Sequence, residues 1–114
     1  MIEKVLLDYL NENLSDPVYM EFPDSAPERF FLLEKTGGSF ADGIAHDTFA
    51  LQSYGGSLFN SASMNLVGIS AMMDAVSLDA VADVKLNSDY NFTDTTRKLD
   101  RYQAVFDITH YETE

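Results

Sequence analysis

Few residues of this sequence have the types and the spacing that catalysis or the binding of a metal or phosphate requires. The chain has two histidines, His46 and His110, and His46 is followed by Asp47. No H-E-x-x-H motif or comparable spacing of metal ligands accompanies them. Residues 35–39, Lys-Thr-Gly-Gly-Ser, are similar to part of a phosphate-binding loop, but they lack the upstream glycine of the full motif and precede a strand pattern where that motif needs a helix. A hairpin tip is therefore the better interpretation.

Carboxylates are abundant but form no recognisable functional set. Asp89, Asn91 and Thr93 have the spacing of the first calcium-loop ligands, yet Asp94 stands where that loop needs glycine and Asp100 where it prefers glutamate. The other acidic residues offer no means of choosing an acid and base pair. The absence of cysteine excludes thiolate chemistry and disulfides. We expect no catalytic residue, no metal and no cofactor, and a protein that is not an enzyme.

The charge balance limits the classes of molecule that the protein is expected to bind. The 114 residues include 19 acidic and 7 basic side chains, for a net charge of -12. Such a chain repels phosphate backbones, which argues against nucleic-acid binding. No apolar run approaches the roughly 20 residues of a membrane helix, and the N-terminus opens into an amphipathic pattern rather than a signal peptide. We therefore expect a soluble, intracellular protein with no membrane contact.

The N-terminal half predicts a helix, an edge strand and a hairpin. Apolar residues at spacings of three and four indicate a helix over residues 2–10, which ends near 13–17. Residues 18–22, which end at Pro23, predict a short edge strand. Residues 29–35 form a hydrophobic strand, and the strand pattern resumes over residues 44–53. These two strands predict a hairpin whose long tip contains residues 37–43.

A second helix follows a predicted cap at Ser57. Its apolar positions step by three and four, as a helix requires; they are Leu58, Ala62, Leu66, Ile69, Met73 and Val76. Gly68 lowers the stability of an isolated helix by about 1 kcal/mol relative to alanine. Alternatively, it permits the close approach of a strand or of a neighbouring chain.

The last third predicts a second hairpin, with strands over residues 84–90 and 101–111 on either side of a polar hinge at 91–97. The second strand has two unlike faces. One carries Tyr102, Ala104, Phe106, Ile108 and His110, and the other carries Gln103, Val105, Asp107, Thr109 and Tyr111. Because both faces include apolar or aromatic residues, we expect one to meet the core and the other a partner.

These elements predict one α+β domain over residues 1–114, in the order α-β-ββ-α-ββ. An antiparallel sheet of four main strands plus a short edge strand should carry both helices on one face. The other face would be exposed, and apolar residues on it would be unfavourable in a monomer and useful in an oligomer.

Four segments carry a family resemblance: FLLEKTGG at 31–38, TFALQSY at 48–54, KLNSDYNFTDTT at 85–96 and RYQAVF at 101–106. In this order, over nearly the whole chain, they resemble the small tail-terminator or tail-completion proteins of long-tailed bacteriophages. The segments are family-like strings and not a catalytic fingerprint. Head-closure or stopper proteins of the same connector are a neighbouring class of similar size.

The resemblance implies a virion structural protein, made in the host cytoplasm, that acts at the head-tail junction. It would form a ring, typically a hexamer, that caps the head-proximal end of the tail tube, stops tube polymerisation and offers a docking surface to the filled head. Its partners would be further copies of itself, the tail tube protein and the head-closure or stopper protein. Six copies would carry 6 × (-12) = -72 charges. With part of this charge lining the lumen, DNA would pass through without specific binding.

Long loops on a rigid sheet usually carry binding, so we expect the protein contacts in the hairpin tip and the hinge. The residues are Thr36, Gly37, Gly38, Ser39, Phe40, Asp42, Gly43, Tyr90, Phe92, Asp94 and Arg97. Phe40 is the expected anchor of the tip, unless it folds back on its own hairpin. Two other classes stay open: an acidic, monomeric module that binds one basic partner, and a small enzyme with a pocket of convergent polar groups.

Overall fold

The computed structural model describes residues 1–111 and has the predicted α+β fold. Its elements follow the predicted order, with one short 3-10 helix, η1, added after the second α-helix. They are α1 (Ile2–Asn13), β1 (Val18–Tyr19), β2 (Phe30–Ala41), β3 (Ile44–Tyr54), α2 (Leu58–Asp74), η1 (Ala75–Ser77), β4 (Val81–Asn91) and β5 (Arg101–Tyr111). Neither helix of this part of the chain is both long and apolar enough to cross a membrane.

The five strands form one open sheet in the order β1-β2-β3-β5-β4. The four long strands pair antiparallel, as predicted. β1 is the predicted edge strand, but it is shorter than residues 18–22 and pairs parallel to β2 through Val18 and Tyr19 alone. Residues 20–28 then leave the sheet, and Pro23 and Pro27 within them have no N–H to donate to a strand ladder.

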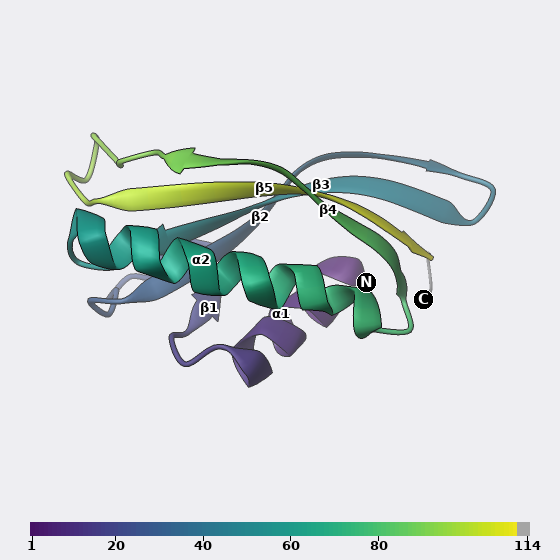
Figure 1. Cartoon of the computed structure of the whole chain (residues 1–114), viewed down its shortest axis with the longest axis horizontal. Coiled ribbons are helices and arrows are strands. Elements are labelled where there is room, and N and C mark those ends of the chain that lie inside the picture. The colour runs from purple at the N-terminus through teal and green to yellow at the C-terminus, as the bar shows by residue number, and fades with distance from the viewer. Residues whose placement is uncertain (112–114) are drawn as a thin grey trace.

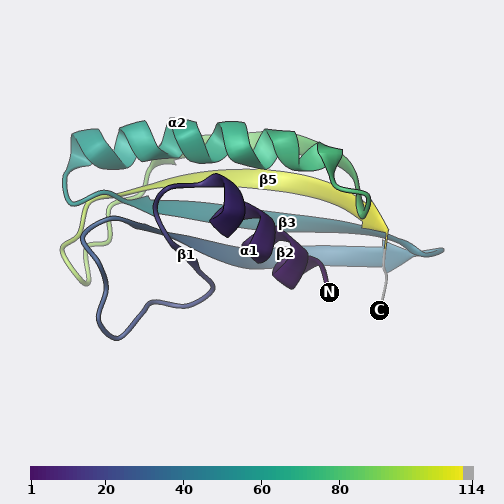
Figure 2. The ribbon, with the colours of Figure 1, turned by 90° about the horizontal axis from the view of Figure 1, so that it is seen from below.

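Both helices cover the same face of the sheet, as Figures 1 and 2 show. α1 contributes Ile2, Leu6 and Leu10 to the core. On β5, Ala104, Phe106 and Ile108 meet the same core, which confirms the prediction for this face of the strand. The core therefore lies between one sheet and two helices, and no helix of residues 1–111 covers the opposite sheet face.

The open sheet face is more polar than the sequence suggested. Hydrogen bonds connect its strands, from Gln52 Nε2 to Gln103 Oε1 (2.8 Å) and from Thr48 Oγ1 to Asp107 Oδ1 (3.1 Å). Its exposed large side chains, such as Tyr90 and Tyr111, lie toward the two ends of the sheet. The prediction that this face meets a partner stays a prediction.

The tip of the first hairpin differs from the prediction. Residues 37–41 are not a loop, because β2 continues through them and pairs with β3 as far as Ala41 and Ile44. The turn consists of Asp42 and Gly43 alone, both at positive φ (56° and 79°). Positive φ at both central residues is the geometry of the two-residue hairpin turn, and Asp-Gly is one of its preferred sequences. The hairpin is therefore long and regular where a loose tip was expected.

Helix α2 begins at its predicted cap and lies close to the sheet at Gly68. Ser57 accepts a hydrogen bond at its hydroxyl from the backbone N–H of Asn60 (3.1 Å). A Cβ atom on Gly68 would lie 2.8 Å from Leu51 Cδ2 and 3.2 Å from Phe31 Cε1. Of the two interpretations of Gly68, the close approach of a strand is therefore the one that the structure supports.

Gly68→Val is expected to lower the free energy of unfolding by about 2 kcal/mol, because the added side chain must displace core atoms of β2 and β3. Chemical denaturation of the dilute protein measures this loss. Ser70→Val, at an exposed position of the same helix, is the matched control for the helix propensity of valine. Equal losses for the two variants would contradict the close packing at Gly68.

Candidate interaction surfaces

The first predicted site is the hairpin of β2 and β3, which extends past the ends of both helices (Figure 1). Thr36, Gly37, Gly38, Ser39 and Phe40 all lie within β2, and Asp42 and Gly43 form the turn. The strand register shifts between Lys35 and Gly37, which leaves Thr36 as an extra residue on β2. These residues are exposed, so the structure presents the predicted tip to solvent on a rigid arm.

A polar cluster from three strands lies at the root of this arm, with its aspartate and histidine buried and its lysine exposed. Asp47 Oδ2 on β3 lies 2.6 Å from His110 Nε2 on β5, and Asp47 Oδ1 lies 3.5 Å from Lys35 Nζ on β2. Asp47 and His110 are 5% and 1% exposed. A substrate cannot reach a histidine at this depth without rearrangement, so the cluster is better suited to joining strands than to acid and base catalysis.

Glycine is required beside this cluster. A Cβ atom on Gly38 would lie only 2.0 Å from Asp47 Oδ1. Gly38 faces Asp47 across the β2–β3 ladder, so any side chain there would move the carboxylate away from His110 and Lys35. Gly38, one of the two glycines that resembled a phosphate loop in sequence, thus makes room for a buried carboxylate.

A surface hollow lies on the part of the hairpin that projects beyond the helices. It has a volume of about 350 Å³ and is lined by Lys35, Gly38, Ser39, Phe40, Ala45 and Asp47. Phe40 pairs with Ala45, and both share the helix-side face of the sheet with Asp47 and Phe49. Phe40 is 60% exposed, so it borders the hollow without closing it. Its ring is available to another molecule, as the prediction of a tip anchor requires.

The second predicted site, the hinge, is a constrained loop at the opposite end of the sheet. Tyr90 belongs to β4, and the loop itself is residues 92–100. Asp94 and Leu99 exchange two backbone hydrogen bonds (2.9 and 3.0 Å). Thr93 is also held, through hydrogen bonds from its N–H and hydroxyl to Asn91 Oδ1. The term hinge is therefore wrong for this segment, because local hydrogen bonds fix its conformation.

Asp94 is the centre of this loop and is buried. It accepts hydrogen bonds from the backbone N–H of Arg97 (3.0 Å), from Arg97 Nη1 (3.1 Å) and from the hydroxyl of Tyr54 (3.3 Å). Arg101 Nη1 lies 3.9 Å away. Burial alone would raise the pKa of Asp94, but the hydrogen bonds from Arg97, the charge of Arg101 and the Tyr54 hydroxyl outweigh it and lower this pKa below its ordinary value.

Aromatic rings surround the same two arginines on the open sheet face. Phe30 and Tyr54 stack with their centroids 4.6 Å apart, and the guanidinium of Arg97 lies 4.0 Å from the ring centroid of Phe22. Arg101 lies 4.3 Å from that of Phe92. Such cation-π contacts hold residues 20–28 and 92–100 against the sheet. Asp94 is buried among these internal contacts, whereas Phe92 and the Arg97 side chain are still 43% and 48% exposed. The predicted contact role of Phe92 and Arg97 stays a prediction.

Asp94→Asn is expected to lower the free energy of unfolding by about 1–3 kcal/mol at pH 7, because the amide loses charge-assisted hydrogen bonds in a buried site. The lowered pKa of Asp94 means that the carboxylate stabilises the fold above its unfolded pKa, about 3.9, and that this contribution is lost as pH falls through the folded pKa. The stability difference between wild type and variant should therefore shrink below about pH 4. Denaturation curves at pH 7 and at pH 3 measure it, and an unchanged difference would contradict this role for Asp94.

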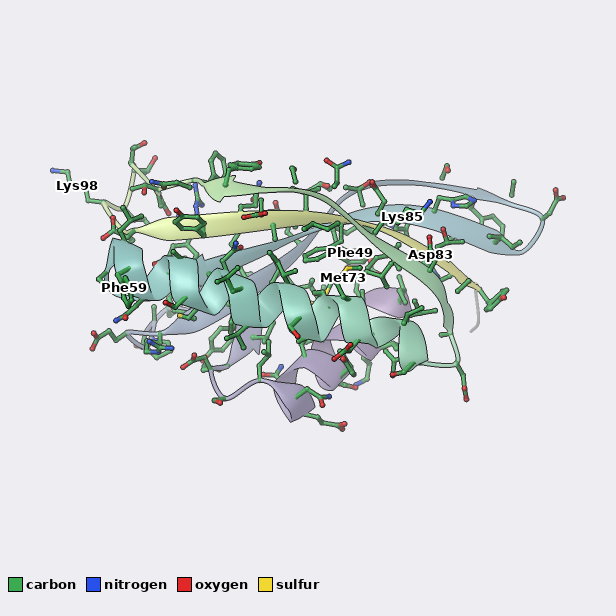
Figure 3. The ribbon with its side chains drawn as sticks, viewed as in Figure 1. Phe49, Phe59, Met73, Asp83, Lys85 and Lys98 are labelled. Carbon is green, nitrogen blue, oxygen red and sulfur yellow. The ribbon has the colours of Figure 1, made fainter. Side chains whose placement is uncertain are left out.

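A third surface, the outward face of α2, was not among the predicted sites. Phe59 is 79% exposed and Leu66 is 69% exposed, and Phe59, Leu66 and Met73 follow one another at intervals of seven residues along the helix. Figure 3 shows Phe59 near one end of the helix and Met73 near the other. We refer to the exposed apolar side chains of this helix and its 3-10 extension as the α2 face; they are Leu58, Phe59, Leu66, Val67, Met73 and Val76.

Most of the apolar positions whose spacing predicted this helix belong to the α2 face. Leu58, Leu66, Met73 and Val76 of the stripe all lie outward. The buried side is Ser61, Met64, Asn65, Gly68 and Met72. Small and polar residues are suited to this side because α2 approaches the sheet closely at Gly68. The single hydroxyl donor of Ser61 lies within hydrogen-bond distance of the carbonyl oxygens of Ser57 (2.8 Å) and Asp100 (3.1 Å).

A sequence signal for this surface exists. Residues 48–73 contain no charged residue, although 23% of the chain is charged. Part of this run is the buried strand β3, which needs no charge. A surface helix normally carries charges on its outer side, so the uncharged α2 half of the run indicates a helix covered on more than one side.

The two predicted sites lie at opposite ends of the molecule, and the α2 face extends between them. Tyr54 and Arg101, beside the 92–100 loop, lie at one end of the β3–β5 ladder, and Ile44 and Tyr111, at the hairpin turn, lie at the other. The molecule is 43 Å long and 24 Å wide. The two predicted loops therefore do not form one site, and the α2 face extends along the molecule on the helix side (Figure 1).

Comparison with known proteins gives no family for this chain. No protein-family model matches it, and none of the curated proteins matches it. The function proposed below is therefore argued from its own surfaces and from the resemblance of its four sequence segments.

Proposed function

We propose that this protein is a subunit of a ring that caps the head-proximal end of a phage tail tube, ends tube polymerisation and offers a docking surface to the head. The assignment to a tail tube rests on the resemblance of the four sequence segments, and the observation that supports assembly is the α2 face, a set of exposed apolar side chains on a chain with a net charge of -12. Such a surface is unfavourable in water, so a protein partner is expected to cover it.

A ring requires two different surfaces on each subunit, because head-to-tail contacts join one patch to another. The projecting hairpin, with its hollow and exposed Phe40, is a second surface unlike the α2 face. The tail-terminator resemblance of the four sequence segments points to the same assembly. A monomeric acidic module would need only one contact surface and would leave the other exposed.

Tube capping tests this proposal directly. The purified protein is added to tail tubes growing from their cognate tube protein, and tube lengths and ends are examined by electron microscopy. We expect density at one end of each tube and an arrest of elongation. Tubes that elongate at an unchanged rate with bare ends would overturn the proposal. Binding to filled heads instead of tubes would identify the stopper class.

A further inference from the structure

We propose that neighbouring copies of this chain join through the β2–β3 hairpin of one and the α2 face of the next, with Phe59 seated in the hollow beside Phe40. This inference rests on the proposed function, since it names the contact between subunits of the ring. The occupant of the α2 face is thus a second copy of the chain.

Charge is the first argument for a second copy. Two chains that each carry a net charge of -12 repel one another at most orientations. The repulsion is weakest where uncharged surfaces meet. Within α2, Asp74 at the last position is the one charged residue. The lining of the hollow carries one charge of each sign, because Lys35 pairs with Asp47 at 3.5 Å. Like-charged copies can therefore approach closely on these two surfaces.

Shape is the second argument. Phe59 is the most exposed large apolar side chain of the described residues, and phenylalanine is enriched in protein interfaces relative to the rest of the surface. The hollow beside Phe40 is open to solvent and measures about 350 Å³. Phe40 would form one wall of the hollow, and the Lys35 side chain another.

Length and placement are the third argument. From Phe59 to Met73 the α2 face covers 14 residues, about 21 Å at 1.5 Å per residue. The six residues 36–41 of the projecting strand cover about 20 Å. Phe59 lies at the end of the molecule opposite the hairpin turn, as Figures 1 and 3 show. The contact therefore joins unlike patches head-to-tail, and with a different neighbour at each patch it generates a ring or an open chain.

Sheet extension is the main alternative contact between copies, and both sheet edges disfavour it. On β4 the register shifts twice, between Val81 and Asp83 and between Leu86 and Ser88. The exposed Lys85 lies between these two shifts. On the opposite edge, β1 covers the start of β2 and a third shift follows Lys35. Bulges and edge charges prevent strands from pairing edge to edge, so we expect copies to meet through side chains.

Cross-linking tests the contact, and the chain suits it because it has no cysteine. Ser39→Cys lies in the lining of the hollow, and Ser63→Cys lies on the outward side of α2, between Phe59 and Leu66. The two variants are mixed at high concentration and treated with a short bis-maleimide. Ser25→Cys, in the exposed 20–28 segment, replaces either partner as the control for random collisions.

We expect covalent dimers in the mixture of Ser39→Cys and Ser63→Cys, with a 39–63 link identified by mass spectrometry. Each variant alone should stay monomeric on a denaturing gel. Dimers of Ser63→Cys with itself would show that α2 pairs with α2 and would overturn the hairpin contact. A yield no higher than that of the Ser25→Cys mixtures would overturn it as well.

The cross-linking result can be distinguished from the result for the proposed ring. A 39–63 link in an assembly that grows without limit would keep the contact and reject a closed ring. A closed ring of fixed mass without the 39–63 link would keep the ring and reject the contact. Light scattering on the unmodified protein supplies the mass in both cases.

Discussion

Asp47→Ala is expected to lower the free energy of unfolding by about 3 kcal/mol. The carboxylate is buried, lies 2.6 Å from His110 Nε2 and 3.5 Å from Lys35 Nζ, and connects three strands at the root of the hairpin. Its removal takes away the acceptor of a histidine that is 1% exposed and leaves a void beside it. Thermal or chemical denaturation measures the loss.

Asp8→Ala is the matched control for Asp47→Ala. Asp8 also forms an ion pair, with Lys4 at 2.8 Å, but both side chains are more than half exposed. Exposed pairs of this kind contribute about 0–1 kcal/mol. The Asp47 variant should in addition lose hydrogen-exchange protection at the backbone amides of the hairpin. Equal losses of stability for the two variants would contradict the role of Asp47 at the hairpin root.

Phe40→Ala and Phe59→Ala are each expected to weaken self-association about 30-fold, the effect of truncating an aromatic anchor worth about 2 kcal/mol. Both side chains are well exposed, so the free energy of unfolding of the dilute monomer should change by no more than about 0.5 kcal/mol. Sedimentation across a concentration series measures the first quantity, and chemical denaturation the second. A large loss of stability for Phe40→Ala would identify it as a core residue of its own hairpin.

Mixing the two variants distinguishes a contact between unlike patches, the hairpin of one copy and the α2 face of the next, from a contact between like patches. Phe40→Ala retains an intact α2 face, and Phe59→Ala retains an intact hairpin, so each mixed pair has one normal contact. The mixture should therefore form dimers that neither variant forms alone, and growth should stop there because the remaining surfaces are defective. No gain on mixing would contradict the head-to-tail contact. Met20→Ala, which shortens an exposed apolar side chain in the 20–28 segment, is the control.

Much of the fold is predictable because alternation and helical spacing are local patterns. The faces of β5 follow directly from alternation, with Phe106 and Ile108 inward and Asp107 outward. The hairpin turn was also readable from its local sequence, since Asp42-Gly43 is a standard two-residue turn. The glycines at 37 and 38 suggested a loop instead, although both lie within β2 and the missing side chain of Gly38 makes room for Asp47.

The candidate surfaces were harder to predict because they depend on contacts between distant residues. His110 and Asp47 are 63 residues apart, and nothing local indicates that β3 and β5 bring them together. The orientation of α2 was hard to predict for the same reason, since it also depends on contacts with distant residues. Helical spacing locates the helix, but the close approach at Gly68 and the hydrogen bonds of Ser61 decide which side faces the sheet. The most apolar stripe consequently faces outward.

The mass of the purified protein, measured by light scattering across a concentration series and again with tail tubes added, tests the ring most directly. A closed ring predicts a mass that stops rising at a fixed multiple of 12.7 kDa, which for six copies is about 76 kDa, or a monomer that assembles only at tube ends. A particle of 12.7 kDa at every concentration that ignores tail tubes would contradict the ring.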